Sequence, residues 1–421
     1  MERYDKYINT GVSWMPRIPS HWKHVQFRGL FKITKRIAGR TGLDVLAVTQ
    51  RGIKVKDVES NEGQIAADYS NYQIVEPGDF AMNHMDLITG FVGISPQYGV
   101  TSPDYRVFKN ISPLVSSQFY LYIFELCYKQ QIFYGLGHGV SNKGRWRLPA
   151  PIQNRFEIPL PPLAEQEKIV SYLEDKTSKI DAYVADKEKE IVLLQELKQK
   201  TIADAVTKGL NPDAKMKDSG ISWIGDIPEH WEVKQLRSFL TLFTEKGHGD
   251  AQLLSVTREQ GVIERDKEDK EENHNFVPDD LSGYKYIEKG DFAINKMKAW
   301  QGSYAVSEYN GIVSPAYFTC KLQGVNKVFF SKAIRSKVYV PFFTQYSKGI
   351  RVGQWDLNPN SLKSIPFFLP PSDEQQAIVA YIEEKCEKID KLASELQSEI
   401  DYLKEYKQRL IADCVTGQVK V

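Results

Sequence analysis

Short stretches rich in cations and amides are the chain's main candidates for chemistry. The stretch HGVSNKGRWRL contains no acidic residue, and its polar side chains are those of Ser141, Asn142, Lys143, Arg145 and Arg147. Guanidinium, ammonium and amide groups form hydrogen bonds with base edges and phosphates. The stretch is therefore a candidate nucleic-acid contact. The alternative interpretation is a solvated loop in which Trp146 serves as a structural anchor.

Two further stretches in the same half of the chain offer similar groups. The stretch MNHMDLITG supplies Asn83 and His84, and TQRGIK supplies Arg51. The first is alternatively a strand end with satisfied polar groups, in which Met85 is a core residue. The second is alternatively a hairpin with exposed charges.

The second half of the chain carries a counterpart of each stretch. YSKGIRVGQW, INKMKAWQG and TREQGVI follow the same order of apolar and polar positions. We expect Met297 to be a core residue and Trp355 to be structural. The polar candidates of the second half are Arg258, Asn295, Lys296, Lys298, Lys348, Arg351 and Gln354. A shared frame with different polar residues is what two related readers of different sequences would show.

Motifs for catalysis are absent from the sequence. It contains no HExxH metal site, no GxSxG nucleophile motif and no GxxxxGK[ST] phosphate loop. DLNPNSL lacks the second proline and the aromatic residue of an amino-methyltransferase motif, so we interpret it as a turn. GLGHG does not follow a convincing strand and is better explained as a loop than as a phosphate cradle. We therefore predict no catalytic residues, no metal ligands and no cofactor in this chain.

An internal repeat covers nearly the whole chain. Between Pro161 and Asp181, 12 of 21 positions are identical to those that begin at Pro370. GVSWMPRIPSHW likewise returns as GISWIGDIPEHW, and PGDFAMNHM returns as KGDFAINKM. Two copies are too few for a solenoid. The pattern indicates a tandem duplication of one globular unit followed by one helical unit.

Each helical unit has an apolar stripe with an 11-residue period. Eleven residues make three turns of about 3.67 residues, so the stripe stays on one face of a nearly straight helix. Each helix is about 40 residues, or roughly 60 Å, and must bury its stripe to be stable. We predict that the two helices pair with each other; the alternative is that each packs on its own domain. The predicted seam is Ile169, Ile180, Ile191, Ile202, Ile378, Ile389, Ile400 and Ile411.

These elements predict an α+β protein. Two similar β-rich globular domains with some helix are separated by two long helices, which pair as an antiparallel coiled coil with pseudo-twofold symmetry. The predicted boundaries are 1–160 for the first globular domain, 161–209 for the first helix, 210–369 for the second domain and 370–421 for the second helix.

Composition limits the alternatives. The 421 residues carry a net charge of +1, with 42% hydrophobic and 26% charged residues, as in ordinary soluble proteins. The four cysteines are scattered, so a disulfide framework or zinc site is not expected. No signal-peptide core or long apolar run is visible, and we expect a cytoplasmic protein without a membrane anchor.

The arrangement resembles the specificity subunits of type I restriction-modification enzymes. The resemblance rests on IPLPPLAEQEKIVSYL and FFLPPSDEQQAIVAYI, on IPEHWE opening the second half, and on IADAVTKG and IADCVTGQ closing the helices. It implies two target recognition domains, each reading one half of a split sequence in double-stranded DNA. The helices would fix the spacer and dock two methyltransferase subunits, which would bind S-adenosylmethionine. A restriction-translocase subunit would complete the complex.

Two other classes of function remain open from the sequence. One is a nuclease or methyltransferase that acts alone, which would need a metal or cofactor motif. The other is a dimerisation scaffold whose two halves bind proteins and not DNA. The sequence does not reveal the half-site sequences or the length of the spacer between them.

Overall fold

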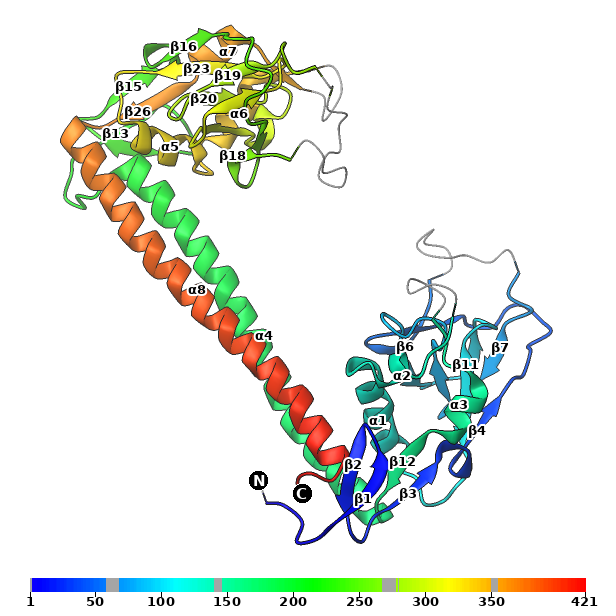
Figure 1. Cartoon of the computed structure of the whole chain (residues 1–421). Coiled ribbons are helices and arrows are strands. Elements are labelled where there is room, and N and C mark those ends of the chain that lie inside the picture. Colours follow the sequence, from blue (N-terminus) through cyan, green and yellow to red (C-terminus); the bar gives the residue numbers. More distant parts are fainter. Residues whose placement is uncertain (1, 58–67, 140–145, 267–277, 279, 350–354) are drawn as a thin grey trace. The chain divides into compact units, whose positions relative to one another are not determined.

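A computed structural model describes the chain except for residues 1, 58–67, 140–145, 267–277, 279 and 350–354. The chain divides into two compact units. Unit 1 contains Met1–Lys187 and Ser398–Val421, and unit 2 contains Glu188–Gln397. Each unit holds one β-rich domain and part of both long helices, α4 (Leu163–Lys208) and α8 (Ser372–Val415) (Figure 1).

The core of unit 1 is a four-stranded antiparallel sheet with the order β4-β11-β8-β9. Phe31, Phe80 and Phe108 project from three of these strands onto Phe124 of α1, with ring centroids 5.5 to 5.7 Å apart. The sheet strands are β4 (Phe31–Thr34), β8 (Phe80–Met82), β9 (Val92–Ile94) and β11 (Arg106–Asn110). Around them lie the strand pairs β1 (Tyr7–Val12) with β2 (Met15–Pro19), β3 (Lys23–Gln26) with β12 (Glu157–Leu160), β5 (Leu46–Thr49) with β6 (Gly52–Val55), and β7 (Gln73–Val75) with β10 (Gly99–Thr101).

Unit 2 repeats this topology. Its central sheet has the order β16-β23-β20-β21, from β16 (Leu240–Phe243), β20 (Phe292–Ile294), β21 (Tyr304–Val306) and β23 (Phe318–Leu322). The strand pairs are β13 (Met216–Asp218) with β14 (Asp226–Pro228), β15 (Glu232–Gln235) with β26 (Pro366–Leu369), β17 (Leu254–Thr257) with β18 (Gly261–Glu264), β19 (Lys285–Ile287) with β22 (Gly311–Val313), and β24 (Ser347–Lys348) with β25 (Asp356–Leu357). The sequence repeat is thus a repeat of strand order.

Short helices cover the sheets. The apolar stretch from 116 to 133 contains the end of one helix and the start of the next, because Gln131 between them adopts a left-handed conformation at φ 55°. The helices are α1 (Ser117–Lys129), α2 (Ile132–Gly135) and α3 (Ala150–Arg155) in unit 1, and α5 (Lys327–Arg335), α6 (Val340–Tyr346) and α7 (Pro359–Ser364) in unit 2. Single 3₁₀ turns occur at η1 (Phe27–Gly29), η2 (Leu236–Ser238) and η3 (Ala299–Gln301).

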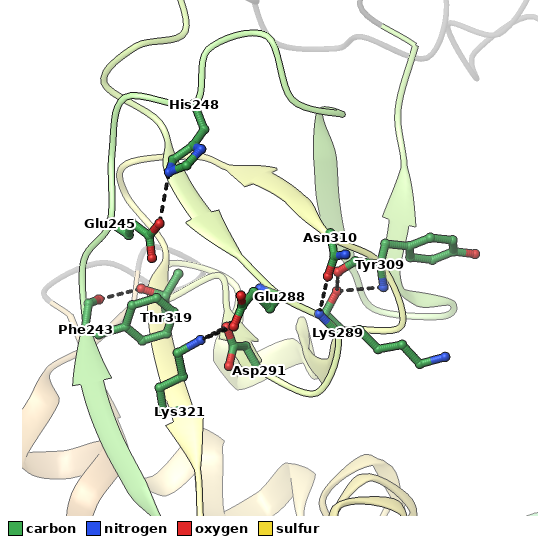
Figure 2. A network of polar contacts seen from close by, with 11 residues as sticks. Phe243, Glu245, His248, Glu288, Lys289, Asp291, Tyr309, Asn310, Thr319 and Lys321 are labelled. Carbon is green, nitrogen blue, oxygen red and sulfur yellow. Dashed lines mark hydrogen bonds and ion pairs between the residues drawn. The ribbon is translucent and has the colours of Figure 1, made fainter.

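A buried aspartate closes the turn before the central strand of each sheet. In unit 2, the Asp291 carboxylate accepts hydrogen bonds from the backbone N–H of Glu288 and from Lys321, both at 2.9 Å (Figure 2). Asp79 occupies the same place in unit 1, but its cation is Arg36, which follows β4. The two units therefore satisfy the same buried carboxylate from different strands, as a buried charge requires.

The Glu-Gln pair at each helix entry joins the long helix to its domain. Gln166 is buried; its Oε1 accepts from the backbone N–H of Ser116 at 2.9 Å, and its Nε2 donates to the first carbonyl of the Pro-Pro pair at 2.9 Å. Gln375 makes the equivalent bonds, with the backbone N–H of Asn326 at 2.9 Å and the matching proline carbonyl at 2.9 Å. The repeated dipeptide therefore fixes where each long helix begins.

The histidines of the repeated HW dipeptides contact the glutamate of the same motif. His21 Nε2 lies 2.9 Å from a Glu165 carboxylate oxygen, and His230 Nε2 lies 2.8 Å from Glu374. The adjacent tryptophans are buried in both units. These residues therefore pack the helix entry onto the domain.

The helices α4 and α8 run antiparallel in both units (Figure 1). As the residue number rises along α4, the number of its partner on α8 falls. The bonded pairs are, in unit 1, Asp181 with Lys407 (2.6 Å) and Tyr183 with Glu399 (3.0 Å), and, in unit 2, Lys198 with Asp390 (2.6 Å). The predicted antiparallel pairing of long helices in an α+β fold is confirmed.

The predicted seam residues differ in burial. Ile169, Ile378, Ile400 and Ile411 are buried, and Ile180, Ile191, Ile202 and Ile389 are partly buried. Further buried positions on the two helices include Leu173, Val184, Val206, Ile382, Ala393, Leu396, Leu410 and Val415. The full apolar face of the pair is therefore wider than one isoleucine stripe, as in ordinary amphipathic helices.

Candidate nucleic-acid interface

Two of the three candidate stretches of unit 1 meet at the end of strand β8. The carbonyl oxygen of His84 accepts a hydrogen bond from the backbone N–H of Leu148 at 3.0 Å. One residue earlier, Arg147 exchanges two backbone hydrogen bonds with His138, at 2.9 and 3.0 Å. The segment after β8 and the base of the 138–148 loop therefore lie side by side. The candidates Ser141, Asn142, Lys143 and Arg145 lie outside the described residues.

The imidazole of His84 is uncharged. Burial, followed by the nearby positive charges of Arg106 and Arg147, lowers the pKa of His84 to about 3. Its Nδ1 is buried and has no partner among the described residues. His84 therefore offers a neutral hydrogen-bonding group at physiological pH, and not a cation for a phosphate.

The other candidates of unit 1 lie in turns. Asn83 is partly buried, and its Oδ1 accepts from the backbone N–H of Met85 at 3.2 Å, so it supports the turn after β8. Arg51 is exposed in the turn between β5 and β6, where its own N–H donates to the Thr49 hydroxyl at 3.1 Å. Of these two side chains, that of Arg51 is the exposed one.

Unit 2 uses the same backbone arrangement with different charges. The carbonyl oxygen of Lys296 accepts from the backbone N–H of Leu357 at 3.1 Å, as that of His84 does from Leu148. The ammonium of Lys296 lies 2.9 Å from the carboxylate of Asp356. Asp356 stands at the position of Arg147, so a neutralised ion pair replaces the cationic cluster of unit 1.

The remaining candidates of unit 2 lie around this pair. Lys348 is exposed and pairs in register with Asp356 across β24 and β25. Lys298 is exposed, and Asn295 donates to the Tyr317 hydroxyl at 3.3 Å. The candidates Arg351 and Gln354 lie outside the described residues.

The β17–β18 turn of unit 2 is fastened beside these residues. Arg258 is exposed and lies 3.0 Å from the carboxylate of Glu259. Arg335 donates to the carbonyl oxygens of Glu259 at 2.8 Å and of Gly302 at 3.0 Å. The guanidinium therefore ties the turn that carries Arg258 to the end of the segment that carries Lys296.

One core assignment was wrong. Met297 is 57% exposed, next to Lys298 in the turn after β20, whereas Met85 is partly buried. The alternating pattern of the strand ends at Ile294, and the following turn directs Met297 to solvent. The tryptophans were assigned a structural role, and Trp146 is partly buried with its indole N–H donating to the Tyr134 carbonyl at 2.8 Å.

Sequence reasoning missed Arg106. It is the first residue of β11 and only 8% exposed, and its Nη1 donates to the Leu148 carbonyl at 2.8 Å and to Gln153 Oε1 at 2.6 Å. Its position at the start of a strand, more than 30 residues before the 138–148 loop, gave no sign that it would lie beside the base of that loop.

The described residues contain no cluster of three or more His, Cys, Asp or Glu side chains able to hold a metal ion. Within the same part of the chain, no helix has the length and apolar content of a membrane span. The cysteines Cys127, Cys320, Cys386 and Cys414 are free thiols.

The chain contains two repeated β-rich domains, each leading into a long helix and each carrying exposed cations. Part of the chain is similar to the type I restriction-modification specificity subunits. Residues 19–192 match the family model described as type I restriction modification DNA specificity domain.

Two specificity subunits are similar to part of the chain in sequence. The chain is 24% identical over 283 residues to the EcoKI specificity subunit of Escherichia coli K12, which is 63% of this chain and 58% of that subunit. It is 26% identical over 290 residues to the MjaVIII specificity subunit of Methanocaldococcus jannaschii, which is 64% of each chain. The matches thus span less than two thirds of these relatives' length.

Two solved structures share the fold. One is a chain of a type I R-M system solved to explain complex assembly and conformational transition, with a TM-score of 0.67, 13% identity, and coverage of 96% of this chain and 99% of that one. The other is the HsdS subunit from Thermoanaerobacter tengcongensis, with a TM-score of 0.53, 14% identity, and coverage of 96% and 98%.

Proposed function

We propose that this chain is the non-catalytic DNA-recognition subunit of a type I restriction-modification complex. Each β-rich domain reads one half of a bipartite target in double-stranded DNA. The proposal rests on one backbone arrangement that occurs in both units, in which the segment after a central strand is hydrogen-bonded to the loop before the helix entry. The side chains at this place differ between the units. His84 and Arg147 stand in unit 1 where Lys296 and Asp356 stand in unit 2. Related frames with different hydrogen-bonding groups suit a target whose two halves differ in sequence.

The exposed cations suit phosphates. Arg51 and Lys298 are exposed in turns, and Lys348 is exposed at the end of β24. Phosphate contacts position a protein on the duplex, whereas contacts to base edges read the sequence. The near-neutral net charge of +1 implies that partner subunits supply a large share of the phosphate contacts.

The helix pair is the proposed docking surface for two methyltransferase subunits. Val192, Leu193 and Leu197 of α4 are 57%, 62% and 50% exposed in unit 2, which is unusual for adjacent large apolar residues. A protein partner that covers them would gain apolar burial. The methyltransferase subunits would carry S-adenosylmethionine, and a restriction-translocase subunit would join the full complex.

A methylome measurement tests this function. A host without its own modification systems would express the chain together with its cognate methyltransferase subunit. The expected result is a new methyladenine motif of two short half-sites separated by a fixed gap. A continuous motif would contradict the bipartite reading. Absence of methylation, with both proteins folded and associated, would favour a protein-binding scaffold.

A further inference from the structure

Arg106 is a buried cation whose hydrogen bonds leave half of its guanidinium unused. Both of its bonds start from Nη1 and end on neutral oxygens, those of Leu148 and Gln153. Among the described residues, Nη2 and Nε have no hydrogen-bond partner, and neither atom is sealed from solvent. Burial lowers the pKa of Arg106 to about 10, so the group stays cationic at neutral pH.

The surroundings of Arg106 lack a described counter-charge. Its titratable neighbours include Tyr128, whose pKa is raised by burial, and His84, which is neutral, and Arg147 is a second cation near the same imidazole. Residues 138–148 contain no acidic side chain. Removing a cation from water without an anion is unfavourable, and an incoming acceptor with negative charge would recover part of that cost.

The second unit shows that the fold does not require this cation. Arg106 pairs with Met82 in the central sheet, and the same register position in unit 2 is Phe318 opposite Ile294. Arg335 of unit 2, which is partly buried, donates from both Nη1 and Nη2 to three backbone carbonyls. Arg335 therefore uses both terminal nitrogens as a structural tie, whereas Arg106 uses one.

We propose that Arg106 presents Nη2 and Nε to a hydrogen-bond acceptor of DNA in the half-site read by unit 1. This inference rests on the proposed function. The acceptor is the O6/N7 edge of a guanine or a phosphate oxygen, which a guanidinium binds with the same two-donor geometry. Leu148 and Gln153 hold the group in place before DNA arrives, so recognition loses little side-chain entropy.

Gln153→Glu tests the proposal without removing Arg106. The substitution places a carboxylate where an amide oxygen lies 2.6 Å from Nη1, so it supplies the missing counter-charge. We expect the complex with its methyltransferase subunits to bind its specific DNA about tenfold more weakly, since the new carboxylate competes with DNA for the guanidinium. If Arg106 is only a structural tie, the same change strengthens the tie and leaves DNA affinity unchanged.

The matched control is Gln118→Glu, the same chemical change in the first turn of α1, where a carboxylate favours the helix dipole. It should leave affinity and motif unchanged. Arg106→Lys provides a second variant that keeps the charge and loses the planar fork. It should weaken binding through the first half-site and preserve recognition of the second.

Modified DNA distinguishes the two acceptors. Single 7-deazaguanines or neutral methylphosphonates would be placed along the first half-site, and each would be measured with wild-type and Gln153→Glu complexes. At one position, the loss of affinity caused by the modified nucleotide and the loss caused by Gln153→Glu should not be additive. That position identifies the base or phosphate that Arg106 binds. Additive losses at every position would overturn the inference while a bipartite wild-type motif upholds the proposed function. Absence of that motif would instead overturn the function.

Discussion

Unit 1 should lose free energy of unfolding as the pH is lowered, because His84 is held neutral in the folded chain. Replacing His84 should remove most of that loss. The pKa of His84 is about 3 in the folded chain, against an ordinary value of 6.5. Between these values the unfolded chain binds a proton that the folded chain excludes. The stabilising contribution is therefore complete above pH 6.5 and declines as the pH falls toward 3. Between pH 7.5 and pH 5.0 the loss is about 2 kcal/mol.

The assay is urea unfolding of the full chain at pH 7.5 and 5.0. The unfolding of unit 1 is detected by pulsed hydrogen exchange in peptides from β8 and β11. The wild-type protein should lose about 2 kcal/mol more than His84→Gln between the two pH values. His138→Gln, a change at an exposed histidine of the adjacent 138–148 loop, is the control and should behave as wild type. An equal pH dependence in wild type and His84→Gln would refute the claim that His84 is held neutral.

Three other predictions address the helices. Gln166→Leu should destabilise unit 1 by about 1–3 kcal/mol, because the backbone N–H of Ser116 loses its acceptor; urea unfolding measures this. Leu193→Glu combined with Leu197→Glu should leave the helix content unchanged by circular dichroism and weaken association with the methyltransferase in a titration. Deleting one 11-residue period from both α4 and α8 should change the gap in the methylation motif and leave both half-sites unchanged. A gap that stays constant would contradict the spacer role.

The sequence was sufficient for features that depend on periodicity. The 11-residue pattern predicted α4 and α8 because an amphipathic stripe must follow the helical period whatever it packs against. It did not reveal that His84 and Leu148 are bonded, because they are 64 residues apart in the numbering and nothing local signals their contact. The exposure of Met297 was missed for a similar reason, since an apolar residue after a strand resembles a continuation of that strand.

The sequence located candidate DNA-binding residues, but it did not show which of them are charged and accessible. Cation-rich stretches are visible in the sequence, but charge state depends on burial. His84 was selected as a polar group, and only its surroundings show that it is neutral. Arg106 was passed over because it lies outside the cation-rich stretches, although its guanidinium donates to the carbonyl of Leu148 at the base of the 138–148 loop.

The composition of unit 1 has a consequence for folding during synthesis. Its apolar core includes Leu410, Ile411, Cys414 and Val415 together with Trp22 and Ile169. Unit 2 is one continuous segment from Glu188 to Gln397. The core of unit 2 can form before that of unit 1. The β-rich domain of unit 1 is synthesised first, but its core is complete only after the last turns of α8 have been synthesised. Until then Ile169 and Leu173 stay uncovered, and we expect the nascent chain to require chaperone protection at that stage.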